Sequence, residues 1–189
     1  ALEEMGLEYQ VFPINILEND QFQPDFLRIS PNNKIPAIVD QDGPKGEAIS
    51  VFESGAILQY LGRKTGQFYP SDEQSRVEVE QWLMWQMGGF GPMLGQNHHF
   101  SKFAPERIAY ATERYVNETK RLYGVLDNQL FGQNYVAGEY SIADMAIFPW
   151  ILRYEWQQID INDYSNVKAY MERIQARPAV QRALALQVN

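Results

Sequence analysis

The sequence contains 189 residues, of which 45% are hydrophobic and 21% charged, the balance of a globular protein large enough for one or two domains. It has no cysteine, which excludes disulfides, thiolate metal sites and a cysteine nucleophile, so any thiol chemistry must use sulfur from a small molecule. The net charge of -8 and the pI near 4.8 argue against nucleic acid or an anionic membrane as the main partner, and without a membrane-length apolar run or a signal-peptide pattern we expect a cytoplasmic protein.

The first third of the chain alternates short extended runs with helix signals, which is the pattern of an α/β unit. Residues 2–5 precede Gly6 in the way that the last turn of a helix precedes a glycine terminator. The apolar residues of segment 9–14 predict a strand, closed by Pro13 and the polar residues that follow.

A hairpin and a helix are predicted next. Ala37–Val39 and Ile49–Val51 have the composition of short strands, and the turn-forming residues 40–44 between them favour a hairpin. From Glu53 to Lys64 the apolar residues recur at helical spacing, and Gly66 lies just past the end of that helix.

After Pro70 the sequence shows helix periods and no convincing strand, so the boundary between the two parts falls near residues 66–72. Segment 71–73 predicts a helix start with acid in its first turn. A long amphipathic helix is predicted from one stripe of residues: Ile108, Ala111, Tyr115, Thr119, Leu122, Leu126 and Leu130.

Two more helices are predicted near the end of the chain. Ser141 and Asp144 have the spacing of a capping box, which begins a mostly buried helix that we expect to continue to Tyr154. Another helix is predicted to end at Arg177, because Pro178 disfavours helical geometry in the residue before it.

The first candidate binding segment is a polar loop that enters a strand through Lys34, Ile35 and Pro36. A cis proline here would turn the backbone N–H and C=O of Ile35 toward an extended ligand, which could pair with them like an added strand. The alternative is a trans proline at the start of an edge strand, and residue types alone favour it because few X–Pro bonds are cis.

The second candidate segment is Glu53 and Ser54, where a strand ends and a helix begins. A helix amino terminus offers N–H donors and partial positive charge to a carboxylate, Ser54 adds a hydroxyl, and Glu53 could accept from an ammonium. Together these groups would hold the head group of an α-amino acid. The alternative, favoured by residue types alone, is helix capping by Ser54 with Glu53 favourable to the helix dipole.

Several motifs, in order along the chain, resemble glutathione transferases. Segments 32–40, 52–57 and 60–61 resemble the N-terminal domain of that family, and residues 140–144 look like the capping box and hydrophobic staple of its helical domain. The run 81–100 looks like the bacterial Nu-class, disulfide-bond reductases related to the yeast regulator Ure2p.

This resemblance implies an α+β two-domain glutathione transferase fold. A thioredoxin-like glutathione-binding domain would cover residues 1–68, and an all-helical domain would cover residues 72–189. In that family the residue at Ile35 pairs its backbone with the cysteinyl part of glutathione, and Pro36 is cis. The residues at Glu53 and Ser54 hold the γ-glutamyl end.

Three further positions complete the implied glutathione site. Gln21 and Lys34 match positions near the glycine end, where an amide or a cation suits a carboxylate. Arg114 matches an arginine of the helical domain that faces the site in the Nu-class, and on periodicity alone it would be a solvated helix-face residue. Nu-class sites resemble a cradle for two glutathiones or one oxidised dimer, which suits a chain without cysteine.

The family's first strand and the turn after it have no counterpart in this sequence, which starts within what would be the first helix. That turn stabilises the glutathione thiolate, and a lowered thiol pKa makes glutathione nucleophilic at neutral pH. The catalytic residue is therefore unassigned and expected upstream of Ala1. We expect the sequence to be part of a longer protein, with a natural fragment of impaired activity as the alternative.

Other candidate residues carry less chemistry. His98 and His99 are adjacent, so on a helix they point in different directions and make a poor metal pair; we expect no metal. A group of large side chains could line a groove, although helix packing within the subunit or across a dimer is the preferred interpretation: Trp82, Met84, Trp85, Met87 and Met93.

The resemblance implies a homodimeric enzyme that uses bound glutathione as the thiol to reduce a disulfide, with weaker transferase activity toward electrophilic small molecules. A non-catalytic glutathione-binding regulatory protein of the same fold is the alternative, because some family members are regulators and the thiolate-stabilising turn is absent. A helical interaction scaffold with an accidental motif match is the third hypothesis.

Overall fold

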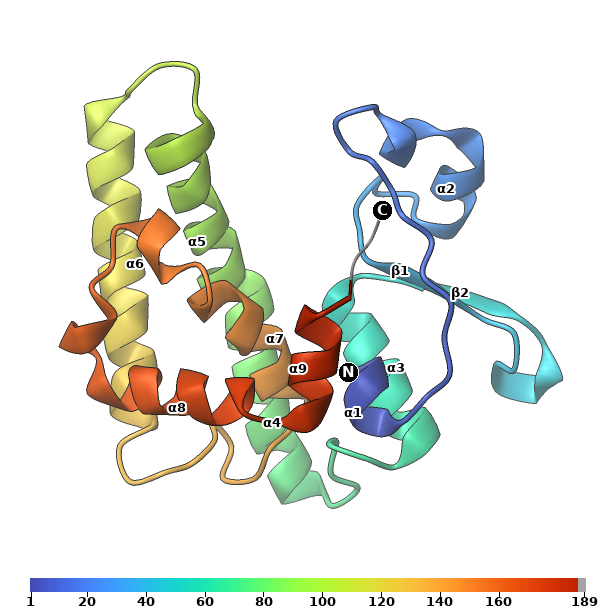
Figure 1. Ribbon diagram of the computed structural model, residues 1–189. Coiled ribbons are helices and arrows are strands. Elements are labelled where there is room, and N and C mark those ends of the chain that lie inside the picture. Colours follow the sequence, from blue (N-terminus) through green and yellow to red (C-terminus); the bar gives the residue numbers. More distant parts are fainter. Residues whose placement is uncertain (187–189) are drawn as a thin grey trace.

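The structure, a computed structural model, describes residues 1–186, which form a small α/β part followed by a larger helical part (Figure 1). The helices and strands are α1 (Leu2–Met5), α2 (Pro24–Ile29), β1 (Ala37–Asp40), β2 (Ile49–Phe52), α3 (Ser54–Thr65), α4 (Glu73–Trp85), α5 (Gly91–His98), α6 (Ala109–Gln129), α7 (Ile142–Ile151), α8 (Ser165–Gln175) and α9 (Pro178–Leu184). Tighter or wider helical turns cover Asp20–Phe22, Pro44–Gly46, Gln86–Phe90, His99–Phe103, Tyr154–Gln157 and Ile161–Asp163. Within the described residues, no helix combines the length and apolar character needed to cross a membrane.

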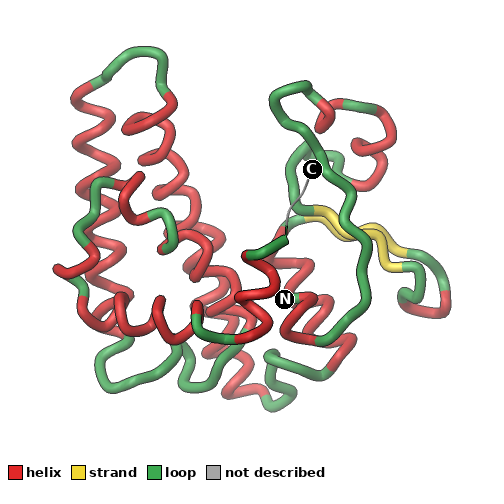
Figure 2. Tube along the Cα trace, viewed as in Figure 1, coloured by secondary structure: helices red, strands yellow, loops and turns green. Residues whose placement is uncertain are grey.

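The predicted hairpin and the helix after it are confirmed. Strands β1 and β2 pair antiparallel, from Ala37 opposite Phe52 to Asp40 opposite Ile49 (Figure 2). Helix α3 follows β2 directly and ends at Gly66, whose φ of 67° is the left-handed conformation that a glycine terminator supplies. Helix α1 likewise ends at Gly6, with a φ of 65°.

The strand predicted at segment 9–14 is wrong. This segment is an irregular loop, drawn green in Figure 2, and among residues 1–186 strands β1 and β2 pair only with each other. An isolated run of β-forming residues stays a loop when no neighbouring strand satisfies its backbone groups. Tyr9 instead donates its hydroxyl to Glu3 at 2.8 Å.

The helical part follows its capping signals. Asp72 caps α4 by accepting from the Ser75 N–H at 2.9 Å. Ser141 and Asp144 form the complete capping box of α7, as predicted. The stripe predicted for α6 becomes fully buried toward its carboxyl end, where Leu122 and Leu126 lie in the core.

Two helix ends differ from the sequence prediction. Helix α7 stops at Ile151, and Tyr154 begins a separate 3-10 turn. Helix α8 ends at Gln175, close to the predicted stop, but Pro178 then opens another helix, α9. Proline interrupts a helix and is also favoured in the first turn of one, which is how it acts here.

One hydrophobic core joins the two parts. It contains Met5 of α1 and Leu61 of α3 together with residues of α4 to α9. Helix α3 contacts α7, and α1 lies beside α9 in Figure 1. The Ile142 N–H donates to the carbonyl of Phe68 at 2.9 Å, which fixes the start of α7 against the chain after α3.

Candidate functional site

The register of the hairpin brings the two candidate binding segments together. Ala37 lies opposite Phe52, so Ile35 and Pro36, just before β1, and Glu53 and Ser54, just after β2, lie at the same end of the hairpin. Antiparallel pairing thus places near each other two segments that are 17 or more residues apart in the sequence.

The Ile35–Pro36 peptide bond is cis, as the family resemblance implies and contrary to the trans alternative. The Ile35 side chain is 54% exposed, and its backbone makes no hydrogen bond to another described residue. The loop is anchored one residue earlier, where the buried Ser30 hydroxyl donates to the Lys34 carbonyl at 2.7 Å. A free peptide group beside a strand end can pair with an extended ligand backbone.

Helix α3 begins without a side-chain cap, so the alternative interpretation of Ser54 as a helix cap is wrong. Glu53 occupies the N-cap position with a φ of 68° and a ψ of 115°, a sparsely populated conformation for a residue with a Cβ. Its carbonyl accepts from the Ile57 N–H at 2.9 Å. The Ser54 hydroxyl points instead to the Met87 sulfur, 3.6 Å away.

This corner has the polar groups that recognise an α-amino acid head group. The uncapped amino end of α3 offers N–H donors and partial positive charge to a carboxylate. The exposed carboxylate of Glu53 can accept from an ammonium. A carboxylate and an ammonium on the same carbon atom would therefore each meet a complementary group.

A network at the other end of the hairpin holds α3 in place. Lys64 donates to Asp40 at 2.6 Å, and the Tyr60 hydroxyl donates to the same carboxylate at 2.6 Å. The Lys64 ammonium and the Tyr60 hydroxyl lower the pKa of Asp40, and the bond to Asp40 raises the pKa of Tyr60 to about 12. These contacts tie the carboxyl half of α3 to β1 and so position its amino end.

Lys34 and Gln21 lie in the same part of the molecule but are not joined to each other by a hydrogen bond among the described residues. The Lys34 side chain is exposed. Gln21 belongs to the 3-10 turn before α2 and donates its amide N–H to the Ile16 carbonyl at 3.3 Å. Its amide oxygen is buried without a protein partner in the described chain, so one acceptor remains for a ligand or water.

Arg114 lies elsewhere, on α6 of the helical part. Its exposed side chain lines a hollow of about 680 Å³ together with residues of α5 and α6: Met93, Tyr110, Glu113, Tyr115, Asn117, Glu118 and Arg121. Within residues 1–186 no hydrogen bond or ion pair joins it to the hairpin end. The structure thus brings Ile35, Pro36, Glu53 and Ser54 to the same end of the hairpin, with Lys34 next to Ile35 in the chain, and leaves Arg114 apart.

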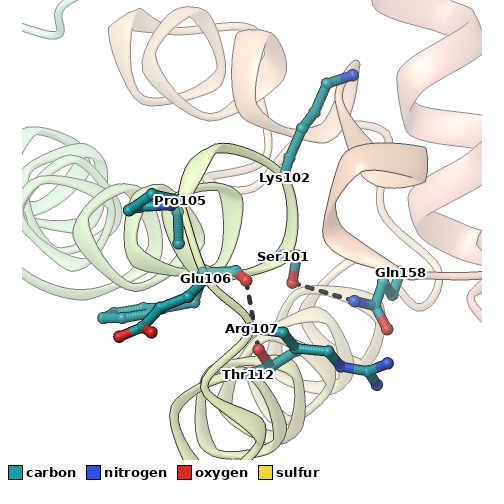
Figure 3. Close-up of a pocket in the computed structure, with 9 residues that line it drawn as sticks. Ser101, Lys102, Pro105, Glu106, Arg107, Thr112 and Gln158 are labelled. Atoms are coloured by element: carbon teal, nitrogen blue, oxygen red, sulfur yellow. Dashed lines mark hydrogen bonds between the residues drawn. The ribbon is translucent and has the colours of Figure 1, made fainter.

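A second hollow, of about 430 Å³, contains none of the predicted residues (Figure 3). It lies between the π turn after α5 and the first turn of α6, where Thr112 donates to the Phe100 carbonyl at 3.3 Å. On its other side Gln158 donates to the Ser101 hydroxyl at 3.1 Å. No group of three or more His, Asp or Glu side chains suited to a metal ion occurs in the described part of the chain.

The contact of Met87 with the amino end of α3 was not predicted from the sequence. The sequence suggested only that Met87 packs between helices or lines a groove. In the structure it lies against both Ser54 and Gly55. Nothing in the local pattern marks this, because the direction of its side chain depends on the π turn in which it lies.

Comparisons with known proteins match both parts of the chain. The family model described as the glutathione S-transferase N-terminal domain matches residues 1–63, and that of the C-terminal domain matches residues 90–178. The disulfide-bond oxidoreductase YfcG of Escherichia coli K12 is 53% identical over 97% of this chain and 86% of its own length.

Solved structures agree with this assignment. A glutathione transferase from Pseudomonas putida, with one glutathione disulfide bound per subunit, is 45% identical with a TM-score of 0.94, covering 99% of this chain and 84% of its own. One from Burkholderia graminis, with two glutathione molecules per subunit, is 47% identical with a TM-score of 0.91, covering 97% and 80%. The α/β part and helical part described above are thus those of a glutathione transferase fold, and the chain belongs to the glutathione S-transferase family.

Proposed function

We propose that this protein is a glutathione-dependent disulfide-bond reductase of the Nu-class, with weaker transferase activity toward electrophilic small molecules. The observation that carries the proposal is the 53% identity, over 97% of the chain, to a bacterial protein named as a disulfide-bond oxidoreductase. The uncapped corner of α3 beside the free Ile35 peptide supports it, because it suits a ligand with an amino acid head and a peptide backbone.

The binding roles follow from the chemistry of each group. In the proposal, the Ile35 backbone, positioned by Pro36, pairs with the cysteinyl peptide of glutathione, while Glu53 and Ser54 hold the γ-glutamyl head. The proposed glutathione-binding domain spans residues 1–68 and the helical domain spans residues 72–189.

Two further contacts involve the other end of the ligand and the second part of the chain. The ammonium of Lys34 would meet the carboxylate of the glycine end, and the unpartnered amide oxygen of Gln21 would accept from a peptide N–H of that end. Arg114 would bind a carboxylate of a second glutathione or of the disulfide substrate from the helical part. We propose a cytoplasmic homodimer in which these residues bind ligands; no residue is assigned to activate the sulfur.

The chemistry is thiol–disulfide exchange. The thiolate of bound glutathione attacks one sulfur of the substrate disulfide, a mixed disulfide forms, and the second sulfur leaves as a thiolate that takes up a proton. A second glutathione thiolate attacks the mixed disulfide, giving glutathione disulfide and the second reduced product. Because the sequence has no cysteine, both electrons come from the two glutathiones.

The decisive measurement is glutathione-dependent reduction of hydroxyethyl disulfide by the natural protein, including any residues that precede Ala1 there. Turnover well above the uncatalysed exchange is expected. Absence of turnover would overturn the proposal; calorimetry that then showed glutathione binding would identify the regulatory alternative. Failure of glutathione to bind at millimolar concentration would leave the scaffold hypothesis.

The site assignment has its own test. Ser54→Ala should raise the glutathione Kd by roughly ten- to a hundredfold, the range for one hydrogen bond to a charged ligand group. Ser165→Ala is a matched control, because Ser165 is also the first residue of a helix and is exposed on α8. Equal Kd values for the two variants would contradict the assignment.

A further inference from the structure

Met87 is the residue of the helical part that contacts the amino end of α3. Its sulfur lies 3.6 Å from the Ser54 hydroxyl oxygen, which donates to it. A Cβ placed on Gly55 would lie 3.1 Å from the Met87 Cγ and 3.3 Å from its sulfur and terminal methyl carbon. Glycine at position 55 therefore permits Met87 to lie directly over the first turn of α3.

The π turn Gln86–Phe90 sets the direction of Met87. Helix α4 continues into this wider turn, which shifts the side chains after it relative to those before it. Trp85 and Phe90 stack with ring centroids 4.8 Å apart, and Phe90 and Gln86 are buried, so both ends of the turn are fixed in the core. Met87 lies between these anchors and contacts α3.

The two sides of the Ser54 corner differ in exposure. On the helical side, Met87 and Ser54 are both half-buried, whereas Glu53 on the other side is exposed. A ligand can therefore approach from the Glu53 side, while Met87 covers the opposite side of the half-buried Ser54. A hydrogen bond formed there is stronger than one in open water.

We propose that Met87 is a positioning residue for the γ-glutamyl head of glutathione, which it serves by holding the Ser54 hydroxyl. This inference rests on the proposed function. A thioether sulfur is a weak acceptor, and a carboxylate is a strong one. The ligand carboxylate therefore takes the Ser54 hydroxyl from the sulfur at little cost, and the hydroxyl is already oriented when the ligand arrives.

The test replaces the acceptor while keeping the length of the side chain. In Met87→Gln an amide oxygen competes with the ligand for the Ser54 hydroxyl, so the glutathione Kd and KM should rise roughly three- to tenfold with kcat unchanged. Met87→Leu keeps the apolar cover but removes the sulfur that orients the Ser54 hydroxyl, so its glutathione Kd should rise by roughly two- to threefold, less than in Met87→Gln. Met84→Gln is the control, because Met84 is 49% exposed on α4 and should change neither constant.

A double-mutant cycle separates this role from simple packing. In a Ser54→Ala background the Met87→Gln substitution should lose its effect on the glutathione Kd, because no hydroxyl is left to capture. Equal effects with and without Ser54 would overturn the inference, as would an unchanged Kd in Met87→Gln. If the wild type binds and turns over glutathione but the cycle shows no coupling between Met87 and Ser54, the inference fails and the proposed function stands. A wild type that does not bind glutathione would overturn both.

Discussion

The buried hydrogen-bond network around Asn97 in the helical part differs from the polar groups at the hairpin end. In the helical part Asn97 is fully buried and donates to both the Thr119 hydroxyl and the Gln157 carbonyl at 2.9 Å. At the hairpin end the Ile35 peptide makes no hydrogen bond to the described chain, and Ser54 has only a sulfur acceptor. Fully partnered buried groups stabilise and specify a fold, whereas open donors and acceptors are available to a ligand.

The apolar side chains show the same difference. The fully buried Tyr123, Tyr170 and Phe90 lie in the helical part, whereas Phe12 and Leu17 of the first loop are 72% and 89% exposed. The helical part is therefore expected to supply most of the stability, and the hairpin end to supply the binding. Substitutions in the first should change unfolding, and substitutions in the second should change affinity.

The largest effect is expected at Asp144 of α7. This fully buried carboxylate accepts from the Val136 N–H at 3.0 Å, the Ser141 N–H at 2.8 Å and the Tyr170 hydroxyl at 2.9 Å. Asp144→Ala leaves these donors unpaired and should lower the unfolding free energy by about 3–5 kcal/mol, measured by urea denaturation.

The matched control for Asp144 is Asp72→Ala, which removes an exposed helix cap with a single backbone bond. Its effect should be much smaller, since water replaces the lost acceptor. Equal losses of unfolding free energy in the two variants would contradict the expected difference between a buried and an exposed cap. Burial also raises the pKa of Asp144, opposed by the hydrogen bonds it accepts.

The next effect concerns the junction of the two parts. Arg177, just before α9, holds both oxygens of Glu4 in α1 at 2.6 and 2.9 Å, and its guanidinium lies 3.8 Å from the centre of the Tyr140 ring. Arg177→Ala should cost about 1–2 kcal/mol by chemical denaturation, because Glu4 is largely buried and solvent screens the pair only in part.

Arg177→Lys should recover only part of that loss, since an ammonium cannot bind both oxygens in the same geometry. Arg182→Ala provides the surface comparison, because Arg182 pairs with Glu3 while 59% exposed. Its effect should be much smaller than that of Arg177→Ala. A larger loss at Arg182 would mean that α1 is held at the surface and not at the buried pair.

The third effect is a pH dependence at His98. The Gln157 amide nitrogen donates to the Trp150 carbonyl at 2.8 Å and lies 3.1 Å from the His98 Nε2, so that nitrogen must be an unprotonated acceptor. Burial, with Arg153 and Lys102 nearby, lowers the pKa of His98. Below pH about 6.5 the unfolded chain binds a proton that the folded protein excludes, so stability falls as pH falls until the lower folded pKa is reached.

Between pH 7 and 5 the wild type should therefore lose more unfolding free energy than a variant without the His98 imidazole. This extra loss is measured as the difference in unfolding free energy between the wild type and His98→Gln over that interval. His99→Gln should follow the wild type, because the His99 side chain is exposed. Parallel curves for the wild type and His98→Gln would refute the assignment.

The sequence predicted what depends on local patterns. Two β-forming runs with a strong turn between them can pair only as a hairpin, which places Ile35 beside Ser54. The capping box at Ser141 was equally local. The network of Asn97, Tyr123 and Gln157 was not predictable, because its members are 26 to 60 residues apart and no period links them.

Other features required the tertiary structure. The run at 9–14 has strand composition, but a strand needs a partner and none pairs with it in the described chain. Helix α9 was missed because a proline signals the end of one helix and also the start of another. The resemblance to a family gave the cis peptide at Pro36, which residue types alone argued against.

The smallest effect has the opposite sign and lies at the hairpin end. Glu53 holds a φ of 68° with a side chain that disfavours it, a strain that costs about 1–3 kcal/mol. Glu53→Gly removes the strain but adds roughly 0.5–1 kcal/mol of backbone entropy, so the unfolding free energy should rise by about 0.5–1 kcal/mol. Glu53→Ala keeps both the Cβ and the strain, so its unfolding free energy should not rise.

Both variants should bind glutathione more weakly than the wild type, because each lacks the carboxylate that meets the ligand ammonium. Chemical denaturation gives the stability of each variant, and calorimetry gives its affinity for glutathione. A glycine variant that is more stable yet binds more weakly would show that the Glu53 conformation favours ligand binding at a cost in stability. A glycine variant that is less stable would show that the Glu53 conformation is not strained.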